Sequence, residues 1–114
     1  MTTAASKLYR AAFRLRDIHP DFTVSQLQLL CLVAETPGII QAEVFQRLGQ
    51  TDSAVSRNIA LLTDIGTRYR DGLELIEVKV NPNDRRARLL SLTRKGKRLF
   101  EDIEGDFNGG KTAR

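Results

Sequence analysis

The sequence has few of the residues on which catalysis, metal binding and cross-linking usually depend. Its 114 residues include one cysteine, one histidine and no tryptophan. The single Cys31 allows no intrachain disulfide, so we expect a reducing cytoplasm. No apolar run is long enough to cross a bilayer, and no membrane partner is expected. The sequence contains no metal-ligand spacing, phosphate-binding loop or nucleophile elbow. We therefore predict no enzyme, no cofactor and no metal site.

Positive charges, by contrast, are present and segregated. Lysine and arginine total 18 against 14 aspartates and glutamates, which gives a formal net charge of +4. The segment 79–98 carries eight of these cations, and Asp84 is its only acid. Such clustering is typical of a protein that meets a polyanion, although a solvated basic surface would have the same composition.

Helical periodicity predicts four helices in the first part of the chain. They span residues 3–18, a stretch from the cap Thr23 to the stop at residues 37–38, residues 41–49 and residues 52–66. In the second helix we expect Cys31 on the buried face, as a small core residue rather than an oxidant sensor. The third and fourth helices are short and are joined by a Gly-containing turn, which indicates a helix-turn-helix.

The periodicity then changes to that of β-strands. Ile76, Val78 and Val80 are predicted to share one face of a first strand, and residues 86–92 are predicted to return as a second strand, with Leu90 and Leu92 inward, after an NPND turn. Thr93 is expected to cap a last helix. A hairpin directly after a helix-turn-helix is the winged-helix arrangement.

The predicted fold class is mainly α with a small β-hairpin wing (α+β), a winged helix-turn-helix. We expect residues 1–107 to form this single domain, with flanking dimerisation helices, and residues 108–114 to form a flexible Gly-rich tail.

The fourth helix carries the residues that we expect to read DNA. The second helix of a helix-turn-helix enters the major groove with its N-terminal residues towards the bases. Hydroxyl and guanidinium groups there can bond to phosphates and base edges. The candidate residues are Ser53, Ala54, Ser56, Arg57 and Asn58. Asp52 is expected to cap the helix, since phosphate would repel it. An ordinary capped surface helix is the alternative interpretation.

The wing is the second candidate DNA contact. Arg85, Arg86 and Arg88 lie at its predicted tip, where arginines can enter a narrow minor groove. We expect Asp84 to orient Arg86 through a bidentate ion pair. The alternative is a charged exposed hairpin whose ion pair has little energetic weight.

Two segments resemble the MarR-type winged-helix transcription regulators. They are "LGQTDSAVSRNIALLTDIG", similar to the recognition-helix segment of that family, and "NPNDRRARLLSLTRKG", similar to its wing. The resemblance covers roughly residues 22–103. It implies sequence-specific binding of double-stranded DNA by a homodimer, usually as a repressor on a palindromic operator. It also implies that Ser53, Ser56 and Arg57 face the major groove, and that Arg86 enters the minor groove with support from Asp84.

Contacts with the DNA backbone are expected from four further residues. Gln41 opens the third helix and Thr51 lies in the turn before the fourth. Arg68 and Arg70 belong to "TRYRDG" (residues 67–72), which is an insertion relative to the family. A longer solvent loop is the alternative interpretation of that insertion.

The first and last helices are expected to form the dimer surface, because their apolar stripes exceed what a small core can cover. The candidate residues are Leu8, Ala12, Leu15, Leu99, Ile103 and Phe107. Mutual covering of the two helices in a monomer is the alternative. Family members usually carry a further C-terminal helix beside a ligand pocket, whereas this sequence ends soon after Phe107, so a small-molecule effector is doubtful.

Two other functions are compatible with the same residues. An architectural or replication/partition factor would use the same DNA surface for a different output. A protein–protein adaptor could use the same fold, and the acidic Asp52 on the presumed reading helix supports it, while the basic wing argues against it.

Overall fold

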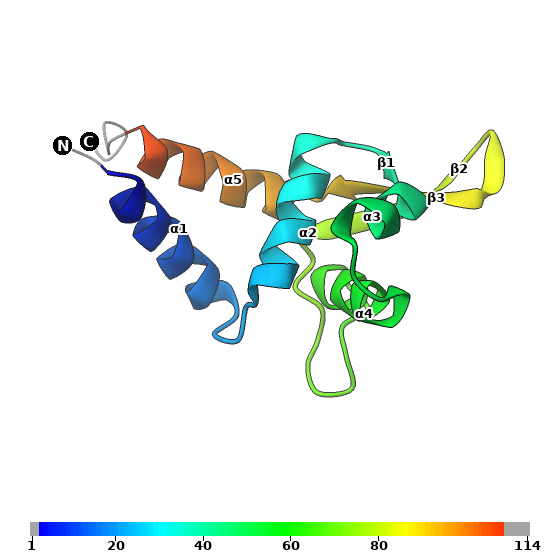
Figure 1. Cartoon of the computed structure of the whole chain (residues 1–114), viewed down its shortest axis with the longest axis horizontal. Coiled ribbons are helices and arrows are strands. Elements are labelled where there is room, and N and C mark those ends of the chain that lie inside the picture. Colours follow the sequence, from blue (N-terminus) through cyan, green and yellow to red (C-terminus); the bar gives the residue numbers. More distant parts are fainter. Residues whose placement is uncertain (1–2, 109–114) are drawn as a thin grey trace.

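The computed structural model describes residues 3–108, which form five helices and a three-stranded antiparallel sheet (Figure 1). In chain order the elements are α1 (Ala4–Ile18), α2 (Val24–Glu35), β1 (Ile39–Ile40), α3 (Gln41–Leu48), α4 (Asp52–Leu62), β2 (Ile76–Asn81), β3 (Asp84–Leu92) and α5 (Arg94–Phe107). The predicted winged helix-turn-helix is confirmed. Of the predicted tail, residues 109–114 lie outside the described residues.

Threonine side chains cap the beginnings of α1, α2, α4 and α5, whereas α3 begins after Ile40 without a side-chain cap. Thr23 caps α2 in a reciprocal capping box with Gln26, in which each side chain bonds to the backbone N–H of the other residue. Thr93 caps α5 by accepting the Gly96 N–H at 3.0 Å. Gly49 ends α3 in the left-handed conformation, with φ of 64°, as expected for a C-terminal glycine. These boundaries agree with the sequence prediction.

Helix α4 ends at Leu62, four residues before the predicted end at Gly66. The reason is the chain that returns alongside it. Backbone N–H groups of Leu73 and Leu75 donate to the carbonyls of Leu61 and Leu62, both at 2.8 Å. The last carbonyls of α4 thus find partners outside the helix, and no further turn is needed to satisfy them.

The sheet has the order β1-β3-β2, with both pairs antiparallel. The two-residue strand β1 pairs with Leu89 and Leu90 of β3 and leads straight into α3. Sequence periodicity missed β1, because two residues show no alternation. This short pairing connects the wing to the helix-turn-helix.

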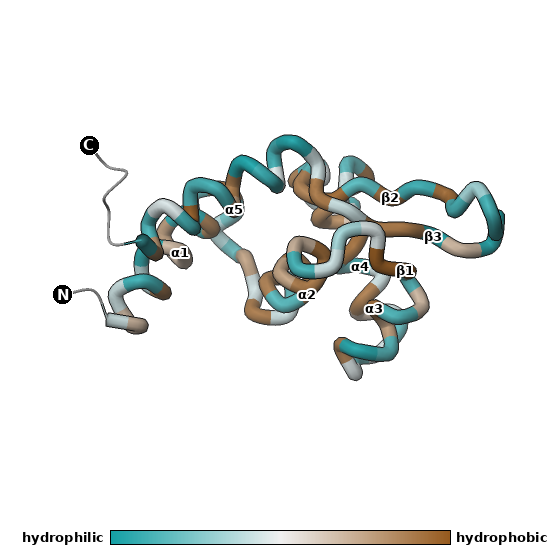
Figure 2. The backbone as a smooth tube through the Cα atoms, turned by 90° about the horizontal axis from the view of Figure 1, so that it is seen from above, coloured by the Kyte–Doolittle hydropathy of each residue, from teal (hydrophilic) through white to brown (hydrophobic). Residues whose placement is uncertain are grey.

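The core lies between the helix-turn-helix, α2 and the inner part of the sheet, while the wing projects away from it (Figure 1). Figure 2 shows the hydrophobic inner portions of the hairpin giving way to a hydrophilic tip. Ile76 and Leu90 are buried, but Val78 and Val80 are 37% and 49% exposed. Val78 and Val80 are exposed although they continue the apolar alternation from Ile76, because this part of the ribbon extends beyond the elements that could cover it.

Cys31 is also exposed, contrary to the sequence prediction. Helix α2 is turned so that Leu29, Leu30, Leu32 and Val33 are buried, which directs Cys31 outward. The helix is apolar over most of its surface, so periodicity alone did not identify its inner face.

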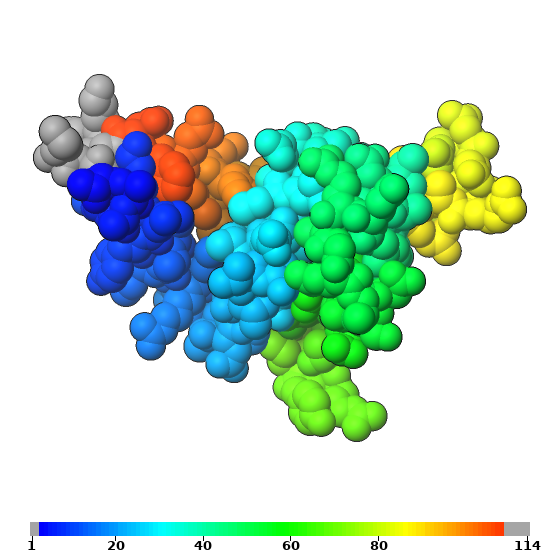
Figure 3. Space-filling model, in the orientation of Figure 1, coloured from blue at the N-terminus to red at the C-terminus, as the bar shows by residue number. Residues whose placement is uncertain are grey.

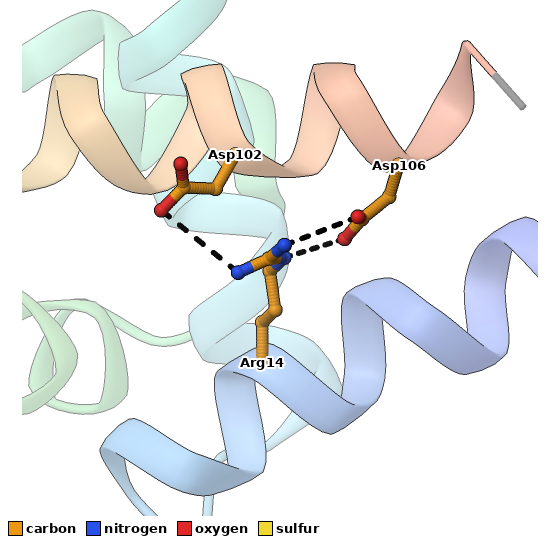
Figure 4. Close-up of polar contacts among 3 residues, drawn as sticks. All are labelled: Arg14, Asp102 and Asp106. Carbon is orange, nitrogen blue, oxygen red and sulfur yellow. Dashed lines mark hydrogen bonds and ion pairs between the residues drawn. The ribbon is translucent and has the colours of Figure 1, made fainter. Parts of the chain in front are cut away.

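Helices α1 and α5 lie side by side at the end of the molecule opposite the wing (Figure 1). Arg14 of α1 joins them by pairing with both carboxylate oxygens of Asp106, and its Nη1 lies 3.9 Å from Asp102 (Figure 4). The Arg14 hydrogen bond and charge lower the pKa of the Asp106 carboxyl. Among residues 3–108, no helix has the length and apolarity needed to span a membrane.

Candidate nucleic-acid interface

The exposed face of α4 carries hydroxyl and guanidinium groups close to its N-terminus. Ser53, Ser56 and Arg57 are exposed, whereas Val55 and Ile59 on the other face are buried in the core. Ala54 is half-buried between these two faces. Helix α4 therefore presents two short hydroxyl side chains and one arginine to solvent, while its opposite face is packed in the core.

The cap of α4 is Thr51, and not Asp52 as the sequence suggested. The Thr51 hydroxyl accepts the Ala54 N–H at 3.2 Å, while Asp52 is the first residue of the helix and is exposed. A carboxylate in the first turn is favourable for the helix dipole. Thr51 therefore has a structural role at this helix start, in addition to any contact with a phosphate.

Helix α2 holds the helix-turn-helix through two side-chain contacts. The Gln26 amide donates to Asn58 Oδ1 of α4 at 3.4 Å, and the Gln50 amide donates to Ser25 Oγ at 3.1 Å. Asn58 is half-buried as a consequence. Its side-chain oxygen is occupied by the protein, which leaves its amide N–H groups for other partners. Gln41, predicted to lie near a phosphate, is half-buried at the start of α3.

The tip of the wing is an irregular segment rather than a regular hairpin end. Val80 pairs with Arg88, but the next residue, Asn81, pairs with Asp84. Residues 85–87 thus have no partner on β2 in the ladder, and they bulge from β3. Such bulges redirect side chains. Here the bulged segment carries Arg85 and Arg86, and the Arg86 side chain is 96% exposed.

Asp84 does not form the predicted bidentate pair with Arg86. One carboxylate oxygen accepts the Arg86 backbone N–H at 3.1 Å, and the same oxygen lies 3.8 Å from the guanidinium Nε. Asp84 shapes the backbone of the turn in this way, while the Arg86 guanidinium extends into solvent. The Arg88 guanidinium bonds to the Arg85 carbonyl at 3.2 Å, which crosses the base of the bulge.

The Thr67–Gly72 loop follows α4 and carries Arg68 and Arg70, which were both predicted to contact the DNA backbone. The two arginines have different surroundings in the structure. Arg68 is exposed at the tip. The Arg70 guanidinium turns back, donating to the Asp71 carbonyl at 2.9 Å and lying 2.7 Å from His19 Nδ1. Because arginine is only a donor, His19 Nδ1 must be the acceptor.

His19 is the residue whose role the sequence analysis missed. It is the C-cap residue of α1 and is 8% exposed. Burial lowers its pKa, the positive charge of Arg70 lowers it further, and Asp21 opposes them. The neutral form that can accept from Arg70 is thereby favoured. Nothing in the sequence links His19 to Arg70, since 51 positions separate them.

The predicted dimer residues divide into two groups. Leu15, Leu99 and Ile103 are buried within the chain itself, so they have little surface left for a partner. Leu8 is 63% exposed and Phe107 is 37% exposed, and Ala12 is also exposed. The apolar surface of α1 is extended by two aromatic residues outside the predicted set, Tyr9 and Phe13, which are 72% and 64% exposed.

Cys31 and the possible metal-ligating side chains complete the description of the site. Although Cys31 is exposed, desolvation by neighbouring groups raises the pKa of its thiol, and Glu35 raises it further, which disfavours the reactive thiolate. Within residues 3–108, no group of three or more His, Cys, Asp or Glu side chains is placed to hold a metal ion.

A helix-turn-helix, a β-wing and two flanking helices together define a winged-helix protein. No protein-family model matches the chain, and no curated protein sequence matches it either. Solved structures do match. RV1404 from Mycobacterium tuberculosis has a TM-score of 0.68 and 23% identity, over 89% of this chain and 64% of that chain.

Two further similar structures contain DNA. A MepR mutant from S. aureus bound to an oligodeoxyribonucleotide has a TM-score of 0.68 and 22% identity, over 96% of this chain and 74% of that chain. A MarR mutant from E. coli complexed with operator DNA has a TM-score of 0.59 and 25% identity, over 87% of this chain and 66% of that chain. The chain has the MarR-type winged-helix fold.

Proposed function

We propose that this protein is a sequence-specific, double-stranded DNA-binding transcription regulator of the MarR type. One observation carries the proposal. The reading face of α4, with Ser53, Ser56 and Arg57, and the bulged wing tip, with Arg85 and Arg86, belong to one winged helix and present their polar groups to solvent. The MarR and MepR structures with bound DNA support the same use of the fold.

The two elements would read different parts of the duplex. Helix α4 enters the major groove, where Arg57 can bond to a guanine edge or to a phosphate. Arg86 enters the neighbouring minor groove, where the potential is most negative. Ala54 and Asn58 lie at the edge of the α4 contact, Arg88 follows the wing, and Thr51 and Gln41 approach the backbone.

The regulator would act in the cytoplasm as a homodimer on a palindromic operator, as a repressor. The exposed apolar residues of α1, with Leu8, Tyr9 and Phe13, support a partner at this end of the chain. A two-fold axis there would place two recognition helices about one helical turn of DNA apart.

Binding to duplex fragments from the upstream region of the protein's own gene tests the proposal. We expect an affinity that falls steeply with salt, because each phosphate contact releases counterions, and a dimer by sedimentation on DNA. A specific complex whose affinity does not depend on salt would contradict the DNA interface. Binding to every fragment alike would favour an architectural factor, and binding to none would favour an adaptor.

Replacement of Arg86 by alanine is the most direct test of the wing. We expect binding to weaken by roughly 1–3 kcal/mol if Arg86 makes a groove contact. Fluorescence anisotropy with a labelled operator duplex measures the loss. Arg98→Ala, which removes an equal charge from an exposed position of α5 outside the proposed DNA and dimer contacts, is the matched control. An unchanged affinity of the Arg86 variant would exclude the wing from the interface.

A further inference from the structure

The Thr67–Gly72 loop is a preformed projection rather than a slack connection. The Thr67 N–H donates to the Arg70 carbonyl at 2.9 Å, and the Arg70 N–H donates back to the Thr67 carbonyl at 3.4 Å. The Thr67 hydroxyl also accepts the Tyr69 N–H at 3.2 Å. These bonds close a four-residue turn whose central residues are Arg68 and Tyr69.

Two tight contacts fix the base of this turn. A Cβ atom on Gly66 would lie 2.5 Å from the Arg70 carbonyl oxygen, and one on Gly72 would lie 1.9 Å from the Thr63 carbonyl oxygen. The backbone approaches closely only because both residues are glycines. The base of the loop therefore packs directly against the C-terminal end of α4.

The two arginines of the loop have different surroundings. Arg70 is held by His19 Nδ1 and by the Asp71 carbonyl, so it anchors the loop to the corner between α1 and α2. Arg68 is exposed, and Tyr69 is 86% exposed at the tip. Arg70 is exposed as well, but its guanidinium is already bonded within the protein, so Arg68 and Tyr69 are the candidates for contact with a partner.

The position of the loop relative to α4 suggests what it meets. The loop projects below α4 in Figure 1, the wing projects to the right, and Figure 3 shows both standing clear of the body. A helix in the major groove has a sugar–phosphate strand on each side of it. If the wing contacts one DNA strand, the Thr67–Gly72 loop, which projects from another side of α4, can reach the other DNA strand.

We propose that the Thr67–Gly72 loop is a second DNA-backbone contact, in which Arg68 and Tyr69 bind a phosphate and Arg70 with His19 positions them. Arginine and tyrosine are both common phosphate donors. Arg70 is a positioning residue here and does not contact DNA, which replaces the role expected for it from the sequence. This inference rests on the proposed function, because it requires the duplex that α4 and the wing bind.

Arg68→Ala and Tyr69→Phe, measured on the duplex that the wild type binds, test the contact. We expect Arg68→Ala to weaken binding about tenfold for each protomer on the duplex, as for loss of one charge-assisted hydrogen bond per protomer. The slope of log affinity against log salt should fall by about one for each protomer. Tyr69→Phe should show a smaller loss, and Arg98→Ala on α5 is the matched charge control.

The possible failures can be told apart. If the wild type binds no duplex, the proposed function fails and this inference fails with it. If the wild type binds and both loop variants match it in affinity and salt slope, the loop inference alone is overturned. A protein partner at Tyr69 would then be the better interpretation of the loop.

The anchoring role is tested by a double-mutant comparison. His19→Ala should reduce affinity and salt slope in the Arg68-containing protein but have little further effect in the Arg68→Ala protein, because it acts through the loop. His19→Gln retains an acceptor and should restore part of the loss. Fully additive losses, with an unchanged salt slope in His19→Ala, would show that His19 does not act through the loop.

Discussion

The wing and the Thr67–Gly72 loop are the two projections of this molecule, and they are built in different ways. The wing is an antiparallel ladder, and its cations are presented by a bulge where the ladder breaks. The loop has one isolated bridge between Thr67 and Arg70, and side-chain contacts fix it. Backbone pairing along a ladder holds the wing, whereas close packing at Gly66 and Gly72 and the contacts of Arg70 hold the loop.

This difference shows that the role of a cation depends on its partners more than on its place in the sequence. Arg86 and Arg70 both lie beside an aspartate in charged loops. The Arg86 side chain is 96% exposed and extends from the wing, while the Arg70 guanidinium contacts an imidazole nitrogen and a carbonyl. We therefore expect the wing to depend on its ladder, and the loop on a few specific contacts.

Gly72→Ala should have the largest effect on stability. Its new Cβ would lie 1.9 Å from the Thr63 carbonyl oxygen, so the backbone must shift. We expect a loss of roughly 1–3 kcal/mol in the free energy of unfolding, measured by chemical denaturation. Asn83→Ala at the wing tip is the control and should change stability by less than about 0.5 kcal/mol. Equal stabilities would mean that the base of the loop is not fixed.

Lowering the pH should loosen the loop and leave the wing unchanged. The folded protein lowers the pKa of His19, so the stabilisation is complete above the ordinary histidine pKa of about 6.5 and is lost as the pH falls below it. Protonated His19 cannot accept from Arg70 and would repel it, although Asp21 partly offsets the charge. Hydrogen-exchange protection factors for Thr67 and Arg70, corrected for intrinsic rates, should fall several-fold between about pH 7.5 and pH 5.

The wing provides the internal control for that experiment. Amides in the paired part of β3, such as that of Leu90, should keep the same protection over the same pH range, because no histidine faces them. In His19→Gln the pH dependence of the loop should disappear. A parallel loss of protection in loop and wing would indicate global destabilisation instead of release of this anchor.

Asp84→Asn should have the smallest effect. The variant keeps an acceptor for the Arg86 backbone N–H, and it loses only an exposed ion-pair contact of 3.8 Å. We expect the free energy of unfolding to change by less than about 0.5 kcal/mol. Thermal unfolding measures it, with Asp84→Ala as the variant that also removes the acceptor. A loss of more than about 1 kcal/mol would show that the ion pair itself holds the wing.

The parts of the fold that could be predicted were those with strong local signals. Thr23, Thr93 and Gly49 mark helix ends through bonds within one turn, and all three act as predicted. The end of α4 could not be predicted, because the chain that satisfies its last carbonyls returns ten residues or more later. The alternation along β2 predicts a strand but not how much of it is covered, and the body covers only the inner end of the ribbon.

The candidate site was predictable where composition carries the signal. Exposed residues of α4 and the arginines of the wing follow from helical periodicity and charge clustering. The bulge in the wing and the different roles of Arg68 and Arg70 could not be predicted, because they depend on contacts between residues that are distant in the sequence. His19 could not be assigned from sequence, because its partner lies 51 positions away and a histidine before a proline suggests only a helix end.

The pairing of β1 with β3 has a consequence for how this protein tolerates insertions. Leu89 and Leu90 are held between β1 and β2, and β1 leads directly into α3. One residue inserted there would move Leu90 out of the core and displace the first helix of the helix-turn-helix. Residues added at Pro82 and Asn83 would leave that pairing intact. The reach of the wing can therefore change during evolution without moving the recognition helix.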